Sequence, residues 1–208
     1  MPEALDRVRD GYIGGARRLA SRSVTGLAQT RVTPNALTAA GVTLCAAAAV
    51  LVYFEYRNEI FFYYVGGAVF VVGSILDILD GALARQSGKG TPFGAFLDST
   101  TDRVSEAFVL AAIALVFYRH REEVALAFTF AAVVGSFLVS YTRARAEALG
   151  IKGDVGIGSR AERVVVISVG LALAPWGGLP YAIYLLTATA WVTVLQRVLH
   201  VRGELHSR

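Results

Sequence analysis

Residues 77–102, DILDGALARQSGKGTPFGAFLDSTTD, connect two long apolar runs and carry four aspartates. The flanking runs, Ile60–Ala84 and Phe93–Tyr118, each have the roughly 20 mostly apolar residues that a bilayer-spanning helix needs. Because the connection Arg85–Pro92 is short, the sequence predicts two antiparallel helices that lie side by side. The aspartates then fall at the same end of both helices.

The composition predicts that lipid surrounds most of the chain. Of its 208 residues, 55% are hydrophobic and 17% are charged, whereas a soluble domain usually has about 25% charged residues. The length suits one domain. A single cysteine, Cys45, excludes an internal disulfide, and the three histidines are too scattered to predict a zinc site. The sequence has neither a Gly-x-Ser-x-Gly motif nor a Walker-type phosphate loop.

Six apolar stretches are predicted to form membrane-spanning helices, since backbone polar groups cannot remain unpaired in hydrocarbon. They are Asn35–Tyr56, Ile60–Ala84, Phe93–Tyr118, Val124–Leu149, Arg160–Ala174 and Leu179–His200. The fifth stretch is short, and its first turns are polar. The predicted fold class is therefore an all-α integral membrane protein with six spans.

The positions of lysine and arginine predict how these helices are oriented. Of the 20 such residues, Arg57, Arg119 and Arg121 fall on one side of the membrane and Arg103 lies within the third span. All the others fall on the side that holds both termini and the four aspartates. Since positive charge accumulates in cytoplasmic loops, we expect a multi-pass protein of the plasma membrane with both termini cytoplasmic.

The N-terminal segment, residues 1–32, has a helical pattern of its own. Apolar residues recur at steps of three and four with arginines between them, at Leu5, Val8, Tyr12, Ala16 and Leu19. This pattern predicts a juxtamembrane amphipathic helix on the lipid headgroups, with a solvated basic tail as the alternative. The transmembrane domain, residues 33–208, then begins with Thr33 as a helix cap and Pro34 at the first helical position.

The four aspartates are the polar groups least expected in a membrane helix, where a charge costs at least about 2.5–3.5 kcal/mol. Asp77 and Asp80 are three residues apart and Asp98 and Asp102 are four apart, so each pair shares one helix face. Oxygen ligands without histidine suit hard cations such as Mg²⁺ or Mn²⁺, and four carboxylates are consistent with two ions. The alternative is a polar seam in which arginines pair with the aspartates.

The spacing D-x-x-D-G-x-x-A-R-x(8)-G-x-x-x-D-x-x-x-D, which begins at Asp77 and ends at Asp102, resembles the motif of the CDP-alcohol phosphotransferase family at every fixed position. The motif is long and specific. The resemblance covers most of the chain, including the six predicted spans and the amphipathic segment before them. It implies a metal-dependent enzyme of phospholipid biosynthesis and a homodimer.

The resemblance also implies roles for individual residues. Two Mg²⁺ or Mn²⁺ ions would bind to Asp77, Asp80, Asp98 and Asp102, and Asp102 would also be the general base toward the acceptor hydroxyl. The CDP-lipid would contact Pro34, Asn35, Thr38, Gly81, Ala84, Arg85 and Thr91. The implied donor is CDP-diacylglycerol or a CDP-activated ether lipid, and CMP is released.

Four arginines at the cytoplasmic ends of the last three spans predict a site for an acceptor phosphate. They are Arg143, Arg160, Arg163 and Arg197. Anchoring to lipid headgroups is the alternative for any one of them. The runs SYTRARAE at 140–147 and RAER at 160–163 are similar to the branch of the family that uses inositol 1-phosphate as acceptor.

Two other functions remain as alternatives. One is transfer to glycerol 3-phosphate, although the Gly-Lys-x-Lys-Thr-x-x-Gln run typical of that branch is missing after the fourth span. The other is a cation-coupled transporter, since intramembrane carboxylates also occur in transporters. The aspartates lie toward one face of the membrane and do not form a path across it, which favours the enzyme. Membrane lipids are expected partners, and a nucleic acid is not.

Overall fold

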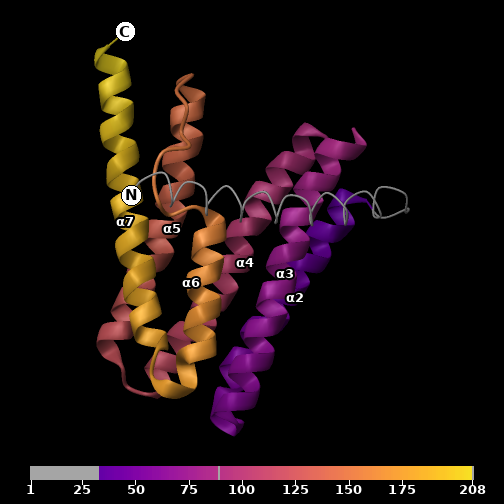
Figure 1. Cartoon of the computed structure of the whole chain (residues 1–208), viewed down its shortest axis with the longest axis vertical. Helices are drawn as coiled ribbons and strands as arrows, with labels where there is room; N and C mark the ends of the chain where they lie inside the picture. Colours follow the sequence, from indigo (N-terminus) through magenta and orange to yellow (C-terminus); the bar gives the residue numbers. More distant parts are fainter. Residues whose placement is uncertain (1–32, 89, 208) are drawn as a thin grey trace, which may run out of the picture.

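A computed structural model describes residues 33–88 and 90–207, and these residues form helices connected by short loops with no strand among them (Figure 1). The helices are α2 (Pro34–Tyr53), η1 (Phe54–Arg57), α3 (Glu59–Ser87), α4 (Pro92–Arg119), α5 (Glu123–Ala148), α6 (Arg160–Leu173), η2 (Ala174–Trp176) and α7 (Leu179–His206). The predicted all-α class is confirmed. The expected amphipathic segment, residues 1–32, lies outside the described residues.

Local capping explains where the helices near the aspartates begin. The Thr33 side chain caps α2 and accepts a hydrogen bond from the Ala36 N–H, with Pro34 in the first turn as predicted. Thr91 caps α4 in the same way, and Gly94 donates its N–H to Thr91 Oγ1 at 2.9 Å. Gly88 ends α3 with φ of 65°, a left-handed conformation that glycine adopts without strain. These caps place both aspartate pairs at the same end of α3 and α4.

Among the described residues, four helical segments are long and apolar enough to cross a membrane: Pro34–Arg57, Glu59–Ala84, Glu123–Ala148 and Leu179–His206. The chain is therefore a multi-pass membrane protein. Large apolar side chains are exposed along these segments, for example Phe130 and Leu195, as expected where lipid is the solvent. The other two expected spans, α4 and α6, are not among the four, because α4 carries its charges within the helix and α6 has only 14 residues.

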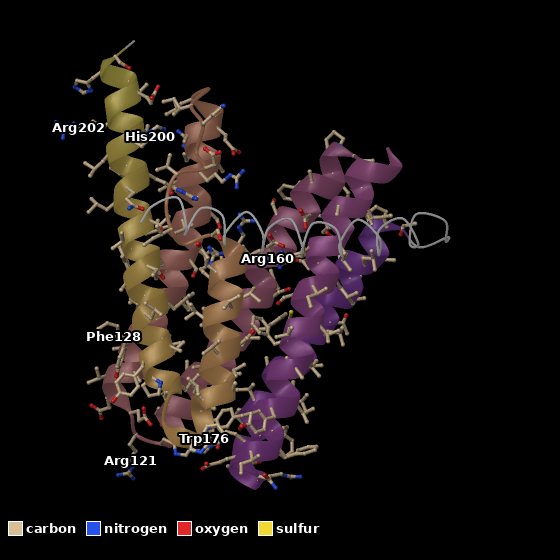
Figure 2. All side chains as sticks on the ribbon, in the orientation of Figure 1. Arg121, Phe128, Arg160, Trp176, His200 and Arg202 are labelled. Atoms are coloured by element: carbon tan, nitrogen blue, oxygen red, sulfur yellow. The ribbon has the colours of Figure 1, made fainter. Side chains whose placement is uncertain are left out.

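The helices pack as two groups joined by α4 and α6. Helix α2 contacts α3 and α4, α5 contacts α7, and α6 lies between α3 and α7 (Figure 1). Figure 2 shows Arg121 and Trp176 at one end of the molecule and His200 and Arg202 at the other. The turns therefore alternate between two ends, as the predicted topology requires.

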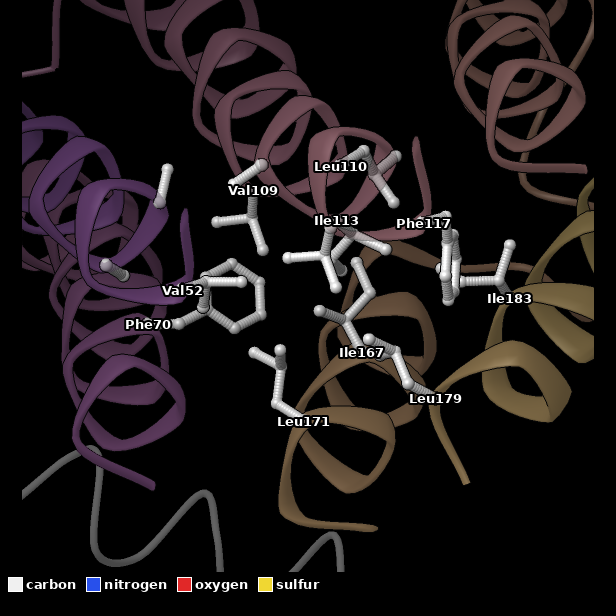
Figure 3. Packing of buried hydrophobic residues seen from close by; sticks show 14 of the residues in the cluster. Val52, Phe70, Val109, Leu110, Ile113, Phe117, Ile167, Leu171, Leu179 and Ile183 are labelled. Atoms are coloured by element: carbon white, nitrogen blue, oxygen red, sulfur yellow. The ribbon is translucent and has the colours of Figure 1, made fainter. Parts of the chain in front are cut away.

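The main hydrophobic core takes side chains from α2, α3, α4, α5, α6 and α7, and Figure 3 shows part of it. Phe70, Ile113, Phe117, Ile167 and Leu171 are fully or almost fully buried there. Nearer to the aspartates, α2 and α3 approach so closely that a Cβ atom at Gly41 would lie 3.0 Å from the Gly73 carbonyl oxygen. This contact brings the start of α2 against the Asp77 turn of α3.

Candidate active site

The aspartates of α3 and α4 meet at the end of the bundle where these helices are connected. Asp77 and Asp80 are buried, each with 2% of its surface exposed, and Asp98 and Asp102 are half-buried. Carboxylate oxygens of Asp77, Asp98 and Asp102 lie within 4.8 Å of one another. The helical spacing in the sequence thus brings three of the four predicted metal ligands into one cluster.

The fourth aspartate, Asp80, lies beside this cluster. Its carboxylate accepts a hydrogen bond from the Thr38 hydroxyl of α2. Asp80 and Asp98 line one cavity together. Thr38 therefore orients Asp80 toward the space that Asp98 also faces.

Metal ions fit this group of residues. Oδ1 of Asp77 and Oδ1 of Asp80 are buried without a hydrogen-bond partner, which is costly for a carboxylate oxygen. All the side-chain ligands are oxygens, the donor set that Mg²⁺ and Mn²⁺ prefer. A divalent cation would pair these oxygens and offset the mutual repulsion of the aspartates.

One arginine reaches into the aspartate cluster. Arg160, the first residue of α6, forms ion pairs with Asp77 and with Asp102, the latter at 2.5 Å from Nη1 to Oδ1. One guanidinium carries a single positive charge against four carboxylates. It is therefore not sufficient to neutralise them.

A cavity of about 360 Å³ lies on one side of the aspartates, between the start of α2 and the α3–α4 connection. Six of the seven residues predicted to contact the CDP-lipid line it, namely Pro34, Asn35, Thr38, Gly81, Ala84 and Thr91. The seventh, Arg85, belongs to α3, but its side chain lies outside the described residues. Residues at the start of α2 and residues of the aspartate motif, Asp80 and Asp98 included, thus line one cavity although they are 40 or more positions apart in the sequence.

A second cavity, of about 190 Å³, lies on the other side of the aspartates and is strongly basic. All four arginines predicted to bind an acceptor phosphate line it, together with Asp102 and a further arginine, Arg103. Asp102 is thus the one predicted metal ligand that borders this cavity.

The arginines of this cavity differ in their hydrogen-bond and ion-pair partners. Arg163 donates from Nε and Nη2 to the two oxygens of Glu106, at 2.8 and 2.9 Å, and from Nη1 to the Gly158 carbonyl at 2.9 Å. Arg197 donates from Nε to the Val155 carbonyl at 2.8 Å, and its Nη1 contacts the Val139 carbonyl. Arg143 pairs with Glu147 on the exposed surface of α5.

Three residues with no predicted role in the site also shape this cavity. Glu106 lies one helical turn after Asp102, and this spacing predicts that both side chains lie on the same face of α4, near the site. Arg103 lines the cavity directly. Thr193, fully buried on α7, accepts the Gly158 N–H at 2.8 Å and donates to the Thr189 carbonyl at 2.7 Å. A threonine in an apolar helix gives no such signal in the sequence.

Fold and site together define a class of protein. Ligands for a hard cation lie at one end of a helical membrane protein, between two cavities. One cavity is lined by glycine and alanine residues, and the other is lined by arginines. This arrangement is that of an enzyme of metal-assisted phosphoryl transfer, in which each substrate reaches the aspartates from its own side.

The chain belongs to the CDP-alcohol phosphatidyltransferase family, whose model matches residues 31–199. The resemblance seen in the aspartate motif is confirmed. Among its relatives, the archaetidylinositol phosphate synthase of Pyrococcus horikoshii is 38% identical over 181 residues, which cover 86% of this chain and 88% of the relative. The phosphatidylinositol phosphate synthase of Mycobacterium marinum is 35% identical, over 87% of this chain and 78% of the relative.

Solved structures show the same fold. The phosphatidylinositol phosphate synthase of Mycobacterium tuberculosis with CDP-DAG bound superposes with a TM-score of 0.77 at 31% identity, covering 88% of this chain and 94% of that one. The same synthase in complex with manganese and citrate also superposes with a TM-score of 0.77, covering 88% of each chain.

Proposed function

We propose that this protein transfers the phosphatidyl group of CDP-diacylglycerol, or the corresponding group of a CDP-activated ether lipid, to inositol 1-phosphate and releases CMP. The observation that carries this proposal is the meeting of two cavities at one aspartate cluster, with four predicted phosphate-binding arginines on the far side of Asp102. The names of the similar synthases support inositol phosphate as the acceptor.

The cavity of about 360 Å³ is the proposed donor site. Gly81 and Ala84 have small side chains, so a nucleotide can approach the α3 backbone there. Asp77, Asp80, Asp98 and Asp102 would hold two Mg²⁺ or Mn²⁺ ions, and the manganese complex of the Mycobacterium tuberculosis synthase supports such ions. When bound, the ions stabilise negative charge on the pyrophosphate during transfer.

Asp102 is the proposed general base, because it borders both the aspartate cluster and the arginine cavity. It takes the proton of the acceptor hydroxyl as that oxygen forms its bond to the lipid-bearing phosphorus. The bond between this phosphorus and the CMP oxygen breaks in the same displacement. Asp102 is the one predicted metal ligand that lines the cavity assigned to the acceptor.

The cavity of about 190 Å³ is the proposed acceptor site. A dianionic phosphate there would be bound by charge-assisted hydrogen bonds from Arg143, Arg160, Arg163 and Arg197. Inositol without a phosphate would bring no anion for these arginines to bind. Glycerol 3-phosphate is the second candidate, since it carries the same phosphate on a smaller alcohol.

For the membrane topology we propose six spans in a domain of residues 33–208. Helix α4 has 28 residues and is about 42 Å long at 1.5 Å per residue, more than the hydrocarbon core requires. Its charged residues other than Arg119 lie between Asp98 and Glu106, in or next to the site, which is why composition alone does not identify it as a span. The proposed location is the plasma membrane with both termini and the active site cytoplasmic, an amphipathic segment before the first span, and a homodimer.

The test is an acceptor panel with the purified protein in detergent. CDP-diacylglycerol and Mg²⁺ or Mn²⁺ are supplied with inositol 1-phosphate, glycerol 3-phosphate, inositol or serine, and CMP release is measured. We expect inositol 1-phosphate to give the highest kcat/KM and chelation of the metal to abolish turnover. A preference for glycerol 3-phosphate would overturn the acceptor assignment. Failure to release CMP with any acceptor, together with cation flux in vesicles, would instead support a transporter.

A further inference from the structure

Arg160 lies at the boundary between the two halves of the site. It is the first residue of α6 and forms ion pairs with Asp77 of α3 and Asp102 of α4. Figure 2 shows it at the beginning of α6, between that helix and α3. Arg160 also lines the arginine cavity. One side chain therefore contacts two predicted metal ligands and borders the proposed acceptor site.

We propose that Arg160 is an internal counter-ion of the metal-binding aspartates, which it must release when they bind cations, and that it then binds the acceptor phosphate. Arg160 would thereby couple metal binding to acceptor binding. The inference rests on the proposed function, since it assumes that metal and acceptor occupy neighbouring sites.

The metal-free state needs such a counter-ion. The Asp77 side chain is 1% exposed, and an unpaired carboxylate at that depth is strongly unfavourable. Arg160 contacts one oxygen of Asp77 and leaves Oδ1 without a partner. Its contact therefore compensates the buried charge only in part, and the aspartates still favour a stronger cation.

The Arg160 guanidinium and a metal ion would compete for the same carboxylates. The oxygens of Asp77, Asp98 and Asp102 that suit a cation lie within 4.8 Å of one another, and Arg160 touches two of these three residues. A guanidinium in that position would be in repulsive contact with a divalent ion. This repulsion favours movement of the Arg160 side chain away from the aspartates when they act as ligands.

The local structure allows the side chain to move while its backbone stays in place. Ser159 and Glu162 form a capping box at the start of α6, which fixes the main chain on both sides of Arg160. The Arg160 side chain is 23% exposed and lines the cavity that also contains Arg143, Arg163 and Arg197. Rotation away from the aspartates thus leaves the guanidinium with the other arginines, where it adds a donor for phosphate.

Thermodynamic linkage makes this coupling measurable. If the metal frees Arg160 for the phosphate, then the metal raises phosphate affinity and the phosphate raises metal affinity by the same factor. Without Arg160, the cation loses a competitor for Asp77 and Asp102. Metal affinity should therefore rise when this arginine is replaced, although the replacement removes a group from the site.

The test is a Mn²⁺ titration of the purified full-length protein in detergent without substrates, with free Mn²⁺ measured by electron paramagnetic resonance. We expect Arg160→Gln to lower the Kd for Mn²⁺ about tenfold, within the usual range of coupling between sites. The matched control is Arg143→Gln, which removes a charge from the same cavity but from a residue that pairs with Glu147. Its Kd for Mn²⁺ should stay within about twofold of wild type. An unchanged or raised Kd in Arg160→Gln, or an equal decrease in both variants, would overturn the inference.

Two further measurements keep the test decisive if Arg160→Gln is unstable without metal. Arg160→Lys retains the charge without the planar guanidinium that bridges two carboxylates, and its Kd for Mn²⁺ should lie between those of wild type and Arg160→Gln. The Kd for inositol 1-phosphate is then measured with and without Mn²⁺. We expect the ratio of the Kd without Mn²⁺ to the Kd with Mn²⁺ to be larger in wild type than in either variant. Equal ratios would refute the coupling. A wild type that binds Mn²⁺ but releases no CMP would refute the proposed function and leave the Mn²⁺ result on Arg160 standing.

Discussion

Two arginines one turn apart on α6 form ion pairs with two acidic residues one turn apart on α4, and the two pairs differ in completeness. In the Arg163–Glu106 pair, both carboxylate oxygens are bound, and the side chains are 6% and 11% exposed. In the Arg160–Asp102 pair the exposures are 23% and 20%, and Arg160 is shared with Asp77. The complete pair is suited to hold α4 against α6. The incomplete pair leaves carboxylate oxygens available for other ligands.

A third buried acid, at the opposite end of the bundle, is paired with basic groups through one of its oxygens. Glu55 is fully buried and pairs with Arg119 at 2.7 Å and His120 at 3.2 Å. Arg119 also lies over the rings of Tyr53 and Tyr56, with centroid distances of 4.8 and 4.4 Å. Oε2 of Glu55 is buried without a hydrogen-bond partner, as are oxygens of Asp77 and Asp80. Glu55 differs from the aspartates of the site in having two basic partners and, among the described residues, no second acid in the same cluster.

The largest expected effect is that of Asp102→Asn, which tests the incomplete pair. The substitution removes the proposed base while Asp77, Asp80 and Asp98 remain as metal ligands. General-base catalysis contributes roughly 10²–10⁴-fold, so CMP release should fall by about a thousandfold while CDP-lipid still binds. The measurement is kcat with saturating Mg²⁺, and Glu123→Gln, an exposed acid at the far end of α5, is the control. Activity within about tenfold of wild type would contradict the role of Asp102 as base.

The next effect concerns the complete pair. Glu106→Gln leaves Arg163 buried with an uncompensated charge, and breaking such a pair typically costs about 3–5 kcal/mol of folding free energy. The free energy of unfolding is measured in mixed detergent micelles. The double variant Glu106→Gln/Arg163→Met removes both charges and should recover part of the loss. If Glu106→Gln changed stability by less than about 1 kcal/mol, the pair would not hold the two helices together.

The sequence was sufficient to predict the helices and most of the residues that the structure brings together around the two cavities. Apolar runs gave the helix positions to within a few residues, although α3 and α7 continue to Ser87 and His206, beyond their apolar parts. An apolar run marks only the part of a helix that lipid or the core surrounds. The aspartate motif and the Thr33-Pro34 start predicted residues that line one cavity, because helical periodicity places them on shared faces.

The sequence could not predict which acid each arginine contacts. Arg160 and Arg163 were expected to share one role at the acceptor phosphate. In the structure Arg160 lies against Asp77, and Arg163 is bound to Glu106. This difference depends on how α6 is rotated and how deep it lies against α3 and α4. The short α6 and the loop before it determine that position through contacts such as Thr193 with Gly158, which lie far apart in the sequence.

A smaller effect is expected from Arg197→Ala. Nε and Nη1 of Arg197 contact the carbonyls of Val155 and Val139, and no carboxylate among the described residues forms an ion pair with this arginine. Its Nη2 is therefore the proposed donor to the acceptor phosphate. A charge-assisted hydrogen bond is worth about 1.5–3 kcal/mol, so the KM for inositol 1-phosphate should rise roughly tenfold to a hundredfold. The KM for CDP-lipid should stay nearly unchanged, because that substrate is assigned to the other cavity. A raised KM for CDP-lipid would assign Arg197 to the donor site.

The smallest expected effect is that of Thr193→Val, which tests whether α7 positions the acceptor cavity through the loop before α6. The substitution keeps the shape of the buried side chain but leaves the Gly158 N–H without its partner, a loss of about 1 kcal/mol. Gly158 also accepts a hydrogen bond from Arg163, so a shift of this loop moves one of the proposed phosphate ligands. The KM for inositol 1-phosphate should therefore rise about fivefold, with the KM for CDP-lipid unchanged. Thr193→Ser retains the hydroxyl and should restore most of the acceptor affinity. A merely structural role would instead lower stability and change both KM values alike, and that result would separate Thr193 from the acceptor site.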